Sequence, residues 1–102
     1  ADSKAEANAL QVRVELQADC LSGVWVNREE KKRPGFLEAG DIDAALRTAT
    51  AIGDDTLQRQ ATGRVVPDSF THGSAAQRKQ WFMTGYQQGT VAACNTFGNA
   101  QL

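Results

Sequence analysis

The first part of the sequence constrains the fold most, because its pattern is that of one long α-helix. From about Lys4 to Val26 there is no proline, and the one glycine, Gly23, comes near the end. Apolar residues recur at intervals of three and four, which is the period of one helix face. Glycine costs about 1 kcal/mol relative to alanine in a helix, so Gly23 is expected to have a packing role. The predicted buried face comprises Leu10, Val14, Ala18, Leu21 and Trp25.

Shorter helices are predicted farther along the chain, between clusters of charge, proline and glycine. The run Arg28–Arg33, followed by Pro34 and Gly35, has the composition of a loop, with a basic contact patch as the alternative. Asp41 is the predicted N-cap of a second helix, which ends at Gly53. The apolar residues of this helix are Ile42, Ala45, Leu46, Ala49 and Ile52.

Two more helices are predicted from their caps. Asp54 or Asp55 would cap a short helix over Thr56–Ala61. The segment Ser74–Gln77 matches a capping box, which starts a helix that ends at Gly89. The whole pattern predicts an all-α fold of about four helices, forming a single domain over residues 1–102.

Composition bounds the function as well as the fold. A chain of 102 residues is enough for one domain, and its formal net charge of −1 supplies no excess of cations for nucleic-acid phosphates. We therefore expect no nucleic-acid partner, and the acidic region Asp41–Asp55 argues further against a helix-turn-helix DNA-binding protein. The sequence predicts neither a transmembrane helix nor a signal peptide.

Histidine and cysteine are scarce in this chain. His72 is the one histidine, whereas self-contained zinc sites usually need two or three His or Cys ligands. Cys20 and Cys94 lie 74 positions apart, so they form no CxxC motif. Composition alone is equally consistent with one disulfide and with two buried thiols.

Two carboxylates lie within the predicted first helix, among apolar residues. Glu15 and Asp19 are four positions apart, which puts them on one helix face, one turn from each other. Carboxylates in an apolar stretch need partners, and a cation would serve both. One could bind a metal ion, while the other accepts the ring N–H of a histidine that binds the same ion. Two surface acids on an ordinary amphipathic helix are the alternative.

The pattern E-x-x-A-D over Glu15–Asp19 resembles the third-ligand helix of zinc metallopeptidases of the glutamate-zincin kind. Four blocks in the family's order extend the match over about residues 12–98, nearly the whole chain. Together they resemble the bacterial putative neutral zinc metallopeptidase family, the YpfJ-like proteins. The blocks are VELQADCLSGVW (14–25), GDIDAAL with AIGDDTLQRQ (40–60), GRVVPDSFTHGSAAQR (63–78) and AACNTFG (92–98).

The resemblance implies a zinc enzyme of which this chain is only a part. The family binds zinc through two histidines of an HExxH helix, whose glutamate is the general base, and this sequence has no HExxH. The chain is therefore predicted to be the C-terminal part of a longer protein, inactive and without zinc when alone, with the upstream HExxH part as its partner. By resemblance, Glu15 is the third zinc ligand and Asp19 holds a ligand histidine. Peptide bonds would be hydrolysed by zinc-activated water.

A second candidate site surrounds the single histidine. Residues 71–74, followed by Arg78, resemble the Thr-His-Pro segment and arginine of related membrane-associated zinc peptidases, although Gly73 replaces the proline. The resemblance implies that His72 stabilises the oxyanion of the tetrahedral intermediate and that Arg78 pairs with Asp19 or another acid. A histidine at a helix entry and an arginine on an exposed face are the alternatives.

Further implications concern the aromatic residues, the cysteines and the compartment. Trp81, Phe82 and Tyr86 are expected in the core, with the wall of a substrate pocket as the alternative. The resemblance favours a disulfide between Cys20 and Cys94, which implies an oxidising compartment. It also implies an extracytoplasmic peptidase domain, anchored to a membrane through a segment outside this chain.

The competing hypothesis is a non-catalytic helical interaction module. It predicts that Glu15 and Asp19 are exposed or paired with arginine within the chain. The peptidase hypothesis predicts that they face the docking position of the upstream part. The surface there would be apolar, so the isolated chain would dimerise. Peptide or protein substrates are expected only under the peptidase hypothesis.

Overall fold

The computed structural model describes residues 3–38, 40–98 and 100–102. Over these residues it contains four α-helices, two short 3₁₀ turns and no strand, which confirms the predicted all-α class. The helices are α1 (Ser3–Lys32), α2 (Asp41–Ile52), α3 (Asp54–Thr62) and α4 (Ala75–Gln88), and the 3₁₀ turns are Pro67–Ser69 and Val91–Cys94.

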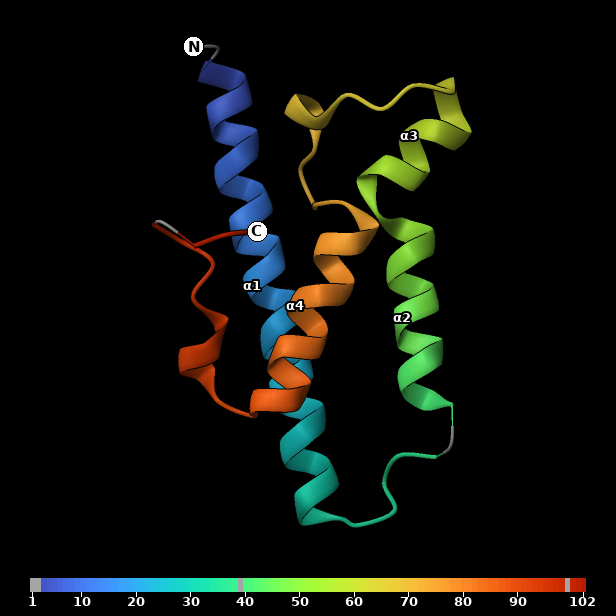
Figure 1. The fold of residues 1–102 in the computed structure, drawn as a ribbon, viewed down its shortest axis with the longest axis vertical. Coiled ribbons are helices and arrows are strands. Elements are labelled where there is room, and N and C mark those ends of the chain that lie inside the picture. The colour runs from blue at the N-terminus through green and yellow to red at the C-terminus, as the bar shows by residue number, and fades with distance from the viewer. Residues whose placement is uncertain (1–2, 39, 99) are drawn as a thin grey trace.

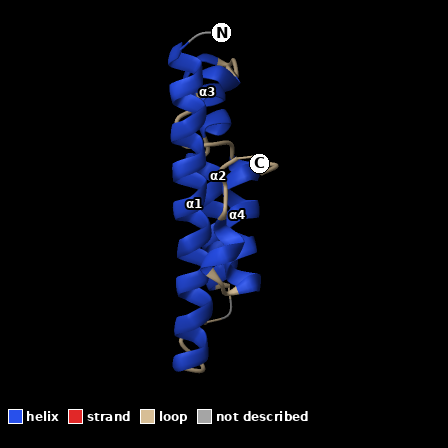
Figure 2. Ribbon diagram, turned by 90° about the vertical axis from the view of Figure 1, so that its left-hand side faces the viewer, coloured by secondary structure: helices blue, strands red, loops and turns tan. Residues whose placement is uncertain are grey.

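The helices form a thin slab with α4 at its centre. In Figure 1, α4 lies between α1 and α2 and packs against both. The Cα atoms extend over 47 × 31 × 14 Å, and the side view in Figure 2 shows how thin the molecule is. Domains usually bury their apolar surface between two or more packed layers. A slab this thin leaves much of its apolar surface exposed.

The contact between α1 and α4 is made backbone to backbone at two glycines. A Cβ atom at Gly23 would collide with the backbone carbonyl oxygen of Phe82, and one at Gly85 with that of Cys20. Only glycine at both positions lets the helix axes approach this closely. The structure thus supplies the packing role that the sequence predicted for Gly23.

The face of α1 that packs against α4 is not the predicted one. The buried residues are Val12, Leu16, Cys20 and Val24, whereas Leu10 is 59% exposed and Trp25 is 56% exposed. Two positions along a helix correspond to a rotation of about 200°, so Val14 and Leu16 lie on nearly opposite faces. Helix α1 therefore carries two apolar faces. The face with the glycine and the cysteine is the buried one, because small residues allow close packing.

Helix α1 is also longer than predicted. Residues 28–32, interpreted as loop from their charge, continue the helix, and an ion pair between Arg33 and Glu29 spans its last turn. The loop begins only at the next residues, where Pro34 and Gly35 were correctly placed in it. Charge alone did not break the helix, because Arg, Glu and Lys are all good helix formers.

The caps of the shorter helices were predicted with mixed success. The Ser74–Gln77 capping box and the stop at Gly89 are confirmed, and Gly89 has the left-handed φ of 68°. Asp41 is not an N-cap: Gly40 precedes α2, and the Asp41 carboxylate accepts the N–H of Glu38. Helix α3 begins at Asp54, two residues earlier than predicted.

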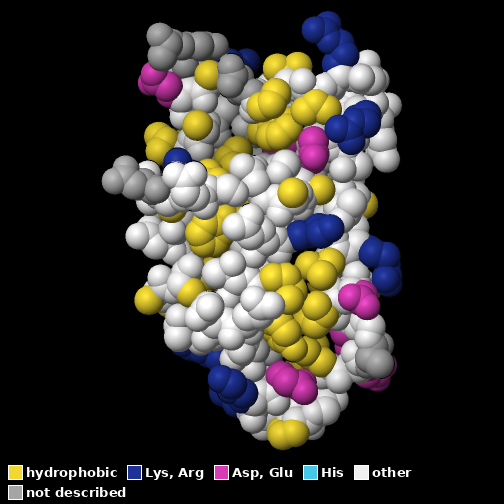
Figure 3. Space-filling view, viewed as in Figure 1, with side chains coloured by type: hydrophobic (Ala, Val, Ile, Leu, Met, Phe, Trp, Pro, Cys, Tyr) yellow, Lys and Arg dark blue, Asp and Glu magenta, His cyan; other side chains and the backbone are white. Residues whose placement is uncertain are grey.

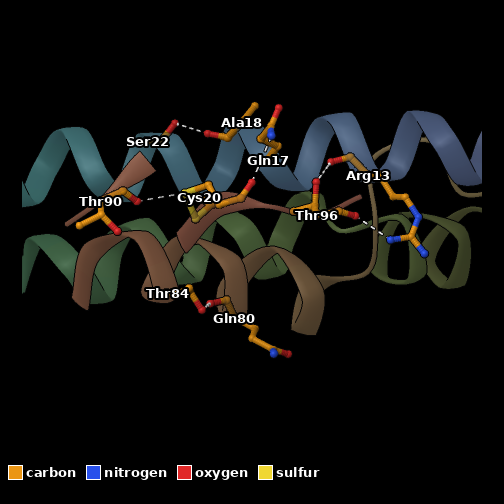
Figure 4. The surroundings of a disulfide bond; sticks show 10 residues. Arg13, Gln17, Ala18, Cys20, Ser22, Gln80, Thr84, Thr90 and Thr96 are labelled. Carbon is orange, nitrogen blue, oxygen red and sulfur yellow. Dashed lines mark hydrogen bonds between the residues drawn. A yellow bond between two sulfur atoms is a disulfide. The ribbon is translucent and has the colours of Figure 1, made fainter. Parts of the chain in front are cut away.

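The C-terminal segment lies along α1 and is joined to it by a disulfide and by hydrogen bonds (Figure 4). A disulfide joins Cys20 to Cys94, which confirms the pairing that the resemblance favoured. The Thr96 hydroxyl donates to the carbonyl of Arg13, and the Arg13 guanidinium donates to the carbonyl of Thr96, both at 2.6 Å. Gln17 adds a bond to the carbonyl of Cys94 at 3.1 Å. The disulfide and these bonds hold the segment against α1.

Candidate metal-binding and catalytic site

The polar centre of the molecule is an ion pair between α1 and α4. The Nε and Nη2 atoms of Arg78 donate to the two carboxylate oxygens of Asp19, each at 3.0 Å. The side chains are only 15% and 18% exposed, respectively. Bidentate guanidinium–carboxylate pairs are among the stronger polar contacts, and their geometry fixes the plane of both groups. The predicted pairing of Arg78 with an acid is thus present, and the acid is Asp19.

Glu15 lies one turn before Asp19 on α1 and is half-buried. Its carboxylate accepts the side-chain N–H of Gln11 at 3.0 Å, and it forms no ion pair with any residue that the structure describes. The hydrogen bond that Arg78 donates to Asp19 raises the pKa of Arg78 against the opposing effect of burial, and the negative charges of Asp19, Glu15 and Asp54 raise it further. The charges of three acids, from α1 and α3, therefore act on the Arg78 guanidinium, and among them Asp19 is the one that forms an ion pair with it.

Asp54 organises the loop that carries His72. One oxygen of its carboxylate, Oδ2, accepts the backbone N–H groups of Thr71, His72 and Gly73 at 3.0, 2.7 and 2.8 Å. The next residue, Asp55, accepts the N–H of Ala75 at the start of α4. The two acids thus cap a loop and a helix distant in sequence, rather than their own helix as predicted. The sequence signal was a pair of consecutive aspartates after a glycine, and it did not reveal which backbone groups these aspartates bind.

His72 is near this carboxylate but faces solvent. Its Nδ1 atom lies 3.8 Å from Oδ1 of Asp54 and 3.0 Å from the hydroxyl of Thr71, and its side chain is 53% exposed. Gly73, with φ of 99°, turns the chain against Leu16, a fully buried residue of α1. The loop therefore brings the residue after His72 against the segment of α1 that carries Glu15.

The structure thus brings the predicted site residues into one region of the slab. Glu15 and Asp19 come from α1, Arg78 from α4, and His72 from the loop before α4. Within the described part of the chain, no group of three or more His, Cys, Asp or Glu side chains could hold a metal ion. Catalytic zinc usually has three protein ligands, so the described residues by themselves do not make such a site.

The aromatic residues of α4 have different surroundings. Trp81 is buried in the core against α1, while Phe82 lines a groove between α4 and α2. Tyr86 is half-buried, and its carbonyl accepts the side-chain N–H of Asn27 at 2.6 Å. The core interpretation is therefore confirmed for Trp81, while the substrate-pocket alternative stays a prediction.

These features describe a small all-α chain with a bidentate Asp–Arg pair where two helices meet. The family described as "Putative neutral zinc metallopeptidase" matches residues 1–97. The chain belongs to this family.

Its relatives in the family are about three times longer. The chain is 55% identical over 98 residues to "Uncharacterized protein YpfJ" of Escherichia coli K12, covering 96% of this chain and 33% of the relative. It is 48% identical over 99 residues to an uncharacterized protein of Mycobacterium tuberculosis H37Rv, covering 89% and 34%. The chain therefore spans about a third of the length of these curated relatives. No solved structure matches it.

Membrane association was expected from the resemblance. Among the residues that the structure places, no helix combines the length and apolarity needed to cross a membrane.

Proposed function

We propose that this chain is the C-terminal part of a longer zinc-dependent metallopeptidase, to which Glu15 supplies the third zinc ligand. The proposal rests on one observation, namely the surroundings and partners of the Glu15 carboxylate. It lies one turn from the Asp19–Arg78 pair, yet it forms no ion pair of its own within the described ranges. A carboxylate held next to a charged cluster, without its own cation, suits a metal ligand.

The upstream part would supply the rest of the zinc site. Two further ligands and a general base would come from an HExxH helix, which this chain lacks. Zinc bound there would supply an activated water for peptide hydrolysis. Alone, the chain would neither bind zinc tightly nor hydrolyse peptides, because it offers one ligand of three.

Asp19 and Arg78 have separate roles in this proposal. Each oxygen of Asp19 accepts one N–H from Arg78, which leaves lone pairs to accept the ring N–H of a zinc-binding histidine. Arg78 is then a positioning residue, because it fixes the carboxylate plane before the histidine arrives. His72 would donate to the oxyanion of the tetrahedral intermediate. Its Nε2 atom has no partner among the described residues, since Thr71 and Asp54 lie near Nδ1.

The second apolar face of α1 supports a docked upstream part. Leu10, Val14, Leu21 and Trp25 are all exposed there, and Trp25 packs edge-to-face on Phe36 with ring centroids 6.0 Å apart. Large exposed apolar stripes of this kind usually mark an interface. In the isolated chain the same stripe would pair with a second copy, which sedimentation of the chain over a concentration series would detect.

Zinc analysis of the longer protein tests the proposal. We expect about one equivalent of zinc in the wild type and its loss in Glu15→Gln, a substitution that keeps size and removes the charge. Glu6→Gln is the matched control, because Glu6 is an exposed acid in the first turn of the same helix. Equal zinc in Glu15→Gln and the wild type would overturn the assignment.

A non-catalytic interaction module is the second candidate, and the pairing of Asp19 with an arginine inside the chain agrees with it. The zinc-peptidase resemblance implies the same pair, so zinc binding has to separate the two hypotheses. Under the interaction-module hypothesis, Asp19→Asn would leave zinc in the longer protein unchanged. Under the peptidase proposal, the same variant would weaken zinc binding roughly 10–100-fold, as losses of hydrogen bonds to metal-binding histidines do.

An extracytoplasmic location is also proposed. Its support is the disulfide between Cys20 and Cys94, since disulfides persist mainly in oxidising compartments. The membrane anchor implied by the family resemblance stays a prediction.

A further inference from the structure

The first turns of α1 extend beyond α4 and border a pocket of about 330 Å³. In Figure 1 these turns lie beside the 3₁₀ turn Pro67–Ser69, whereas α4 begins nearer the middle of α1. The walls of the pocket are mainly apolar and come from both segments. An apolar cavity of roughly 150 Å³ holds a benzene ring, so this pocket has room for one or two apolar side chains.

The face of α1 that packs against α4 continues into this pocket. Ala5 and Ala9 precede the buried Val12 at intervals of four and three, so all three lie on one helix face. All three line the pocket, yet Ala9 is exposed and Ala5 is only half-buried. Farther along the same face, Leu16 and Cys20 are fully buried. The face is thus covered along its middle and open at its start.

Apolar surface continues from the pocket onto the loop opposite α1. Phe70 and Pro67 line the pocket on that side, and Val65 and Val66, directly before Pro67, are 36% and 48% exposed. Figure 3 shows apolar side chains gathered in the upper part of the molecule, where Figure 1 places the 3₁₀ turn. Exposed apolar surface beside a pocket of this kind usually marks an interface.

The position of Glu15 indicates what covers the pocket. Glu15 comes three residues after Val12, which is about 5 Å along the helix axis at a rise of roughly 1.5 Å per residue. An upstream part that brings zinc ligands to Glu15 must therefore come near the pocket. The curated relatives have the length for such a part, since this chain covers only 33% and 34% of them.

We propose that the upstream part of the longer protein docks at this pocket and fills it with one or two apolar side chains. The docked segment lies between Ala9 on α1 and Phe70 on the opposite loop, close to the Glu15 carboxylate. The inference rests on the proposed function, because it requires an upstream part that approaches Glu15. It adds a second contact to the exposed face around Leu10 and Val14, which lies on another side of α1.

Photo-crosslinking of the longer protein would identify what fills the pocket. The crosslinking residue p-benzoylphenylalanine would replace Phe70, which keeps an aromatic ring at the site, and the crosslinked peptides would be mapped by mass spectrometry. We expect crosslinks to apolar residues of the upstream part. Crosslinks confined to this chain or to a second copy of it, or no crosslinks at all, would overturn the inference.

Filling the pocket from α1 provides a matched pair of variants. Ala9→Phe puts a ring into the pocket, whereas Ala51→Phe puts the same ring on an exposed position of α2. Ala9→Phe should reduce the upstream crosslinks about tenfold, because the space for a buried apolar side chain is then taken, and Ala51→Phe should retain them. Equal crosslinking in the two variants would contradict the inference. Ala9→Leu is a milder filling variant, should the aromatic ring disturb the fold, which circular dichroism would reveal.

Zinc analysis of the same samples separates this inference from the proposed function. One equivalent of zinc in a wild type that gives no upstream crosslinks would overturn the docking site and leave the zinc assignment intact. Upstream crosslinks in a wild type that holds no zinc would support the docking site and overturn the proposed function.

Discussion

The two sides of α4 differ in how tightly they are packed. On the α1 side, two glycines bring the backbones into contact and a disulfide closes beside them. On the other side, neither α2 nor α3 has a single residue buried among those described, and a groove separates α2 from α4. The Asp19–Arg78 pair lies at the boundary between these two sides, at one end of the groove. Rigid elements hold reacting groups in place, and loosely packed ones admit ligands.

Removing the disulfide should have the largest effect on this comparison. For a loop closed by residues 74 positions apart, the chain-entropy model gives about 4 kcal/mol of stability. We expect the Cys20→Ala/Cys94→Ala variant to unfold at correspondingly lower urea concentration, measured by circular dichroism. Reduction of the wild type is the control and should give the same shift. A loss of less than about 1 kcal/mol in the free energy of unfolding would show that the hydrogen bonds of Arg13 and Thr96 suffice to hold the C-terminal segment on α1.

The glycine contact should come next. Gly85→Ala would drive a Cβ into the carbonyl of Cys20, and overpacking against backbone should cost about 3 kcal/mol. Gly63→Ala is the comparison, because no atom lies within 4 Å of a Cβ there and only the left-handed φ of 75° opposes it. That strain should cost about 1 kcal/mol. Equal losses in urea unfolding would contradict the close-contact explanation.

The Asp19–Arg78 pair should have an intermediate effect. In a double-mutant cycle with Asp19→Asn and Arg78→Gln, we expect a coupling of about 2 kcal/mol, less than for a fully buried pair because both side chains are partly exposed. The pKa of Arg78 is raised in the folded protein, so its stabilising contribution is fully present below the unfolded pKa and is lost only as pH rises through the folded one. The coupling should therefore stay constant between about pH 6 and 9. A coupling free energy that falls between about pH 6 and 9 would contradict the conclusion that Arg78 stays charged throughout this range.

Truncation on the open side should matter least. Ile52 is 43% exposed, so Ile52→Ala should cost only about 0.5–1 kcal/mol in urea unfolding. Leu16→Ala, at a fully buried position of α1, should cost several times more, about 2–5 kcal/mol. Similar losses at the two positions would mean that α2 packs as firmly as α1.

Sequence patterns predicted the helices better than their contacts. The Ser74–Gln77 box and Gly89 bounded α4 correctly, because capping depends on residues within one turn. The exposed and buried faces of α1 were confused, because both are apolar and periodicity cannot choose between them. For the site, residue spacing put Glu15 and Asp19 one turn apart. It could not reveal that the Asp54 carboxylate accepts the backbone N–H groups of residues 71–73, since that contact joins segments distant in sequence.

By itself the sequence determined the all-α class, the main helices and the candidate residues, because helix period, caps and motifs are local properties. Tertiary structure alone decided which apolar face of α1 meets α4, since the choice depends on where glycines from two helices coincide. It also decided that Arg78 pairs with Asp19, and that the Asp54 carboxylate binds the backbone of the loop that contains His72. Each of these is a contact between distant segments, and its energy exists only once the helices are packed.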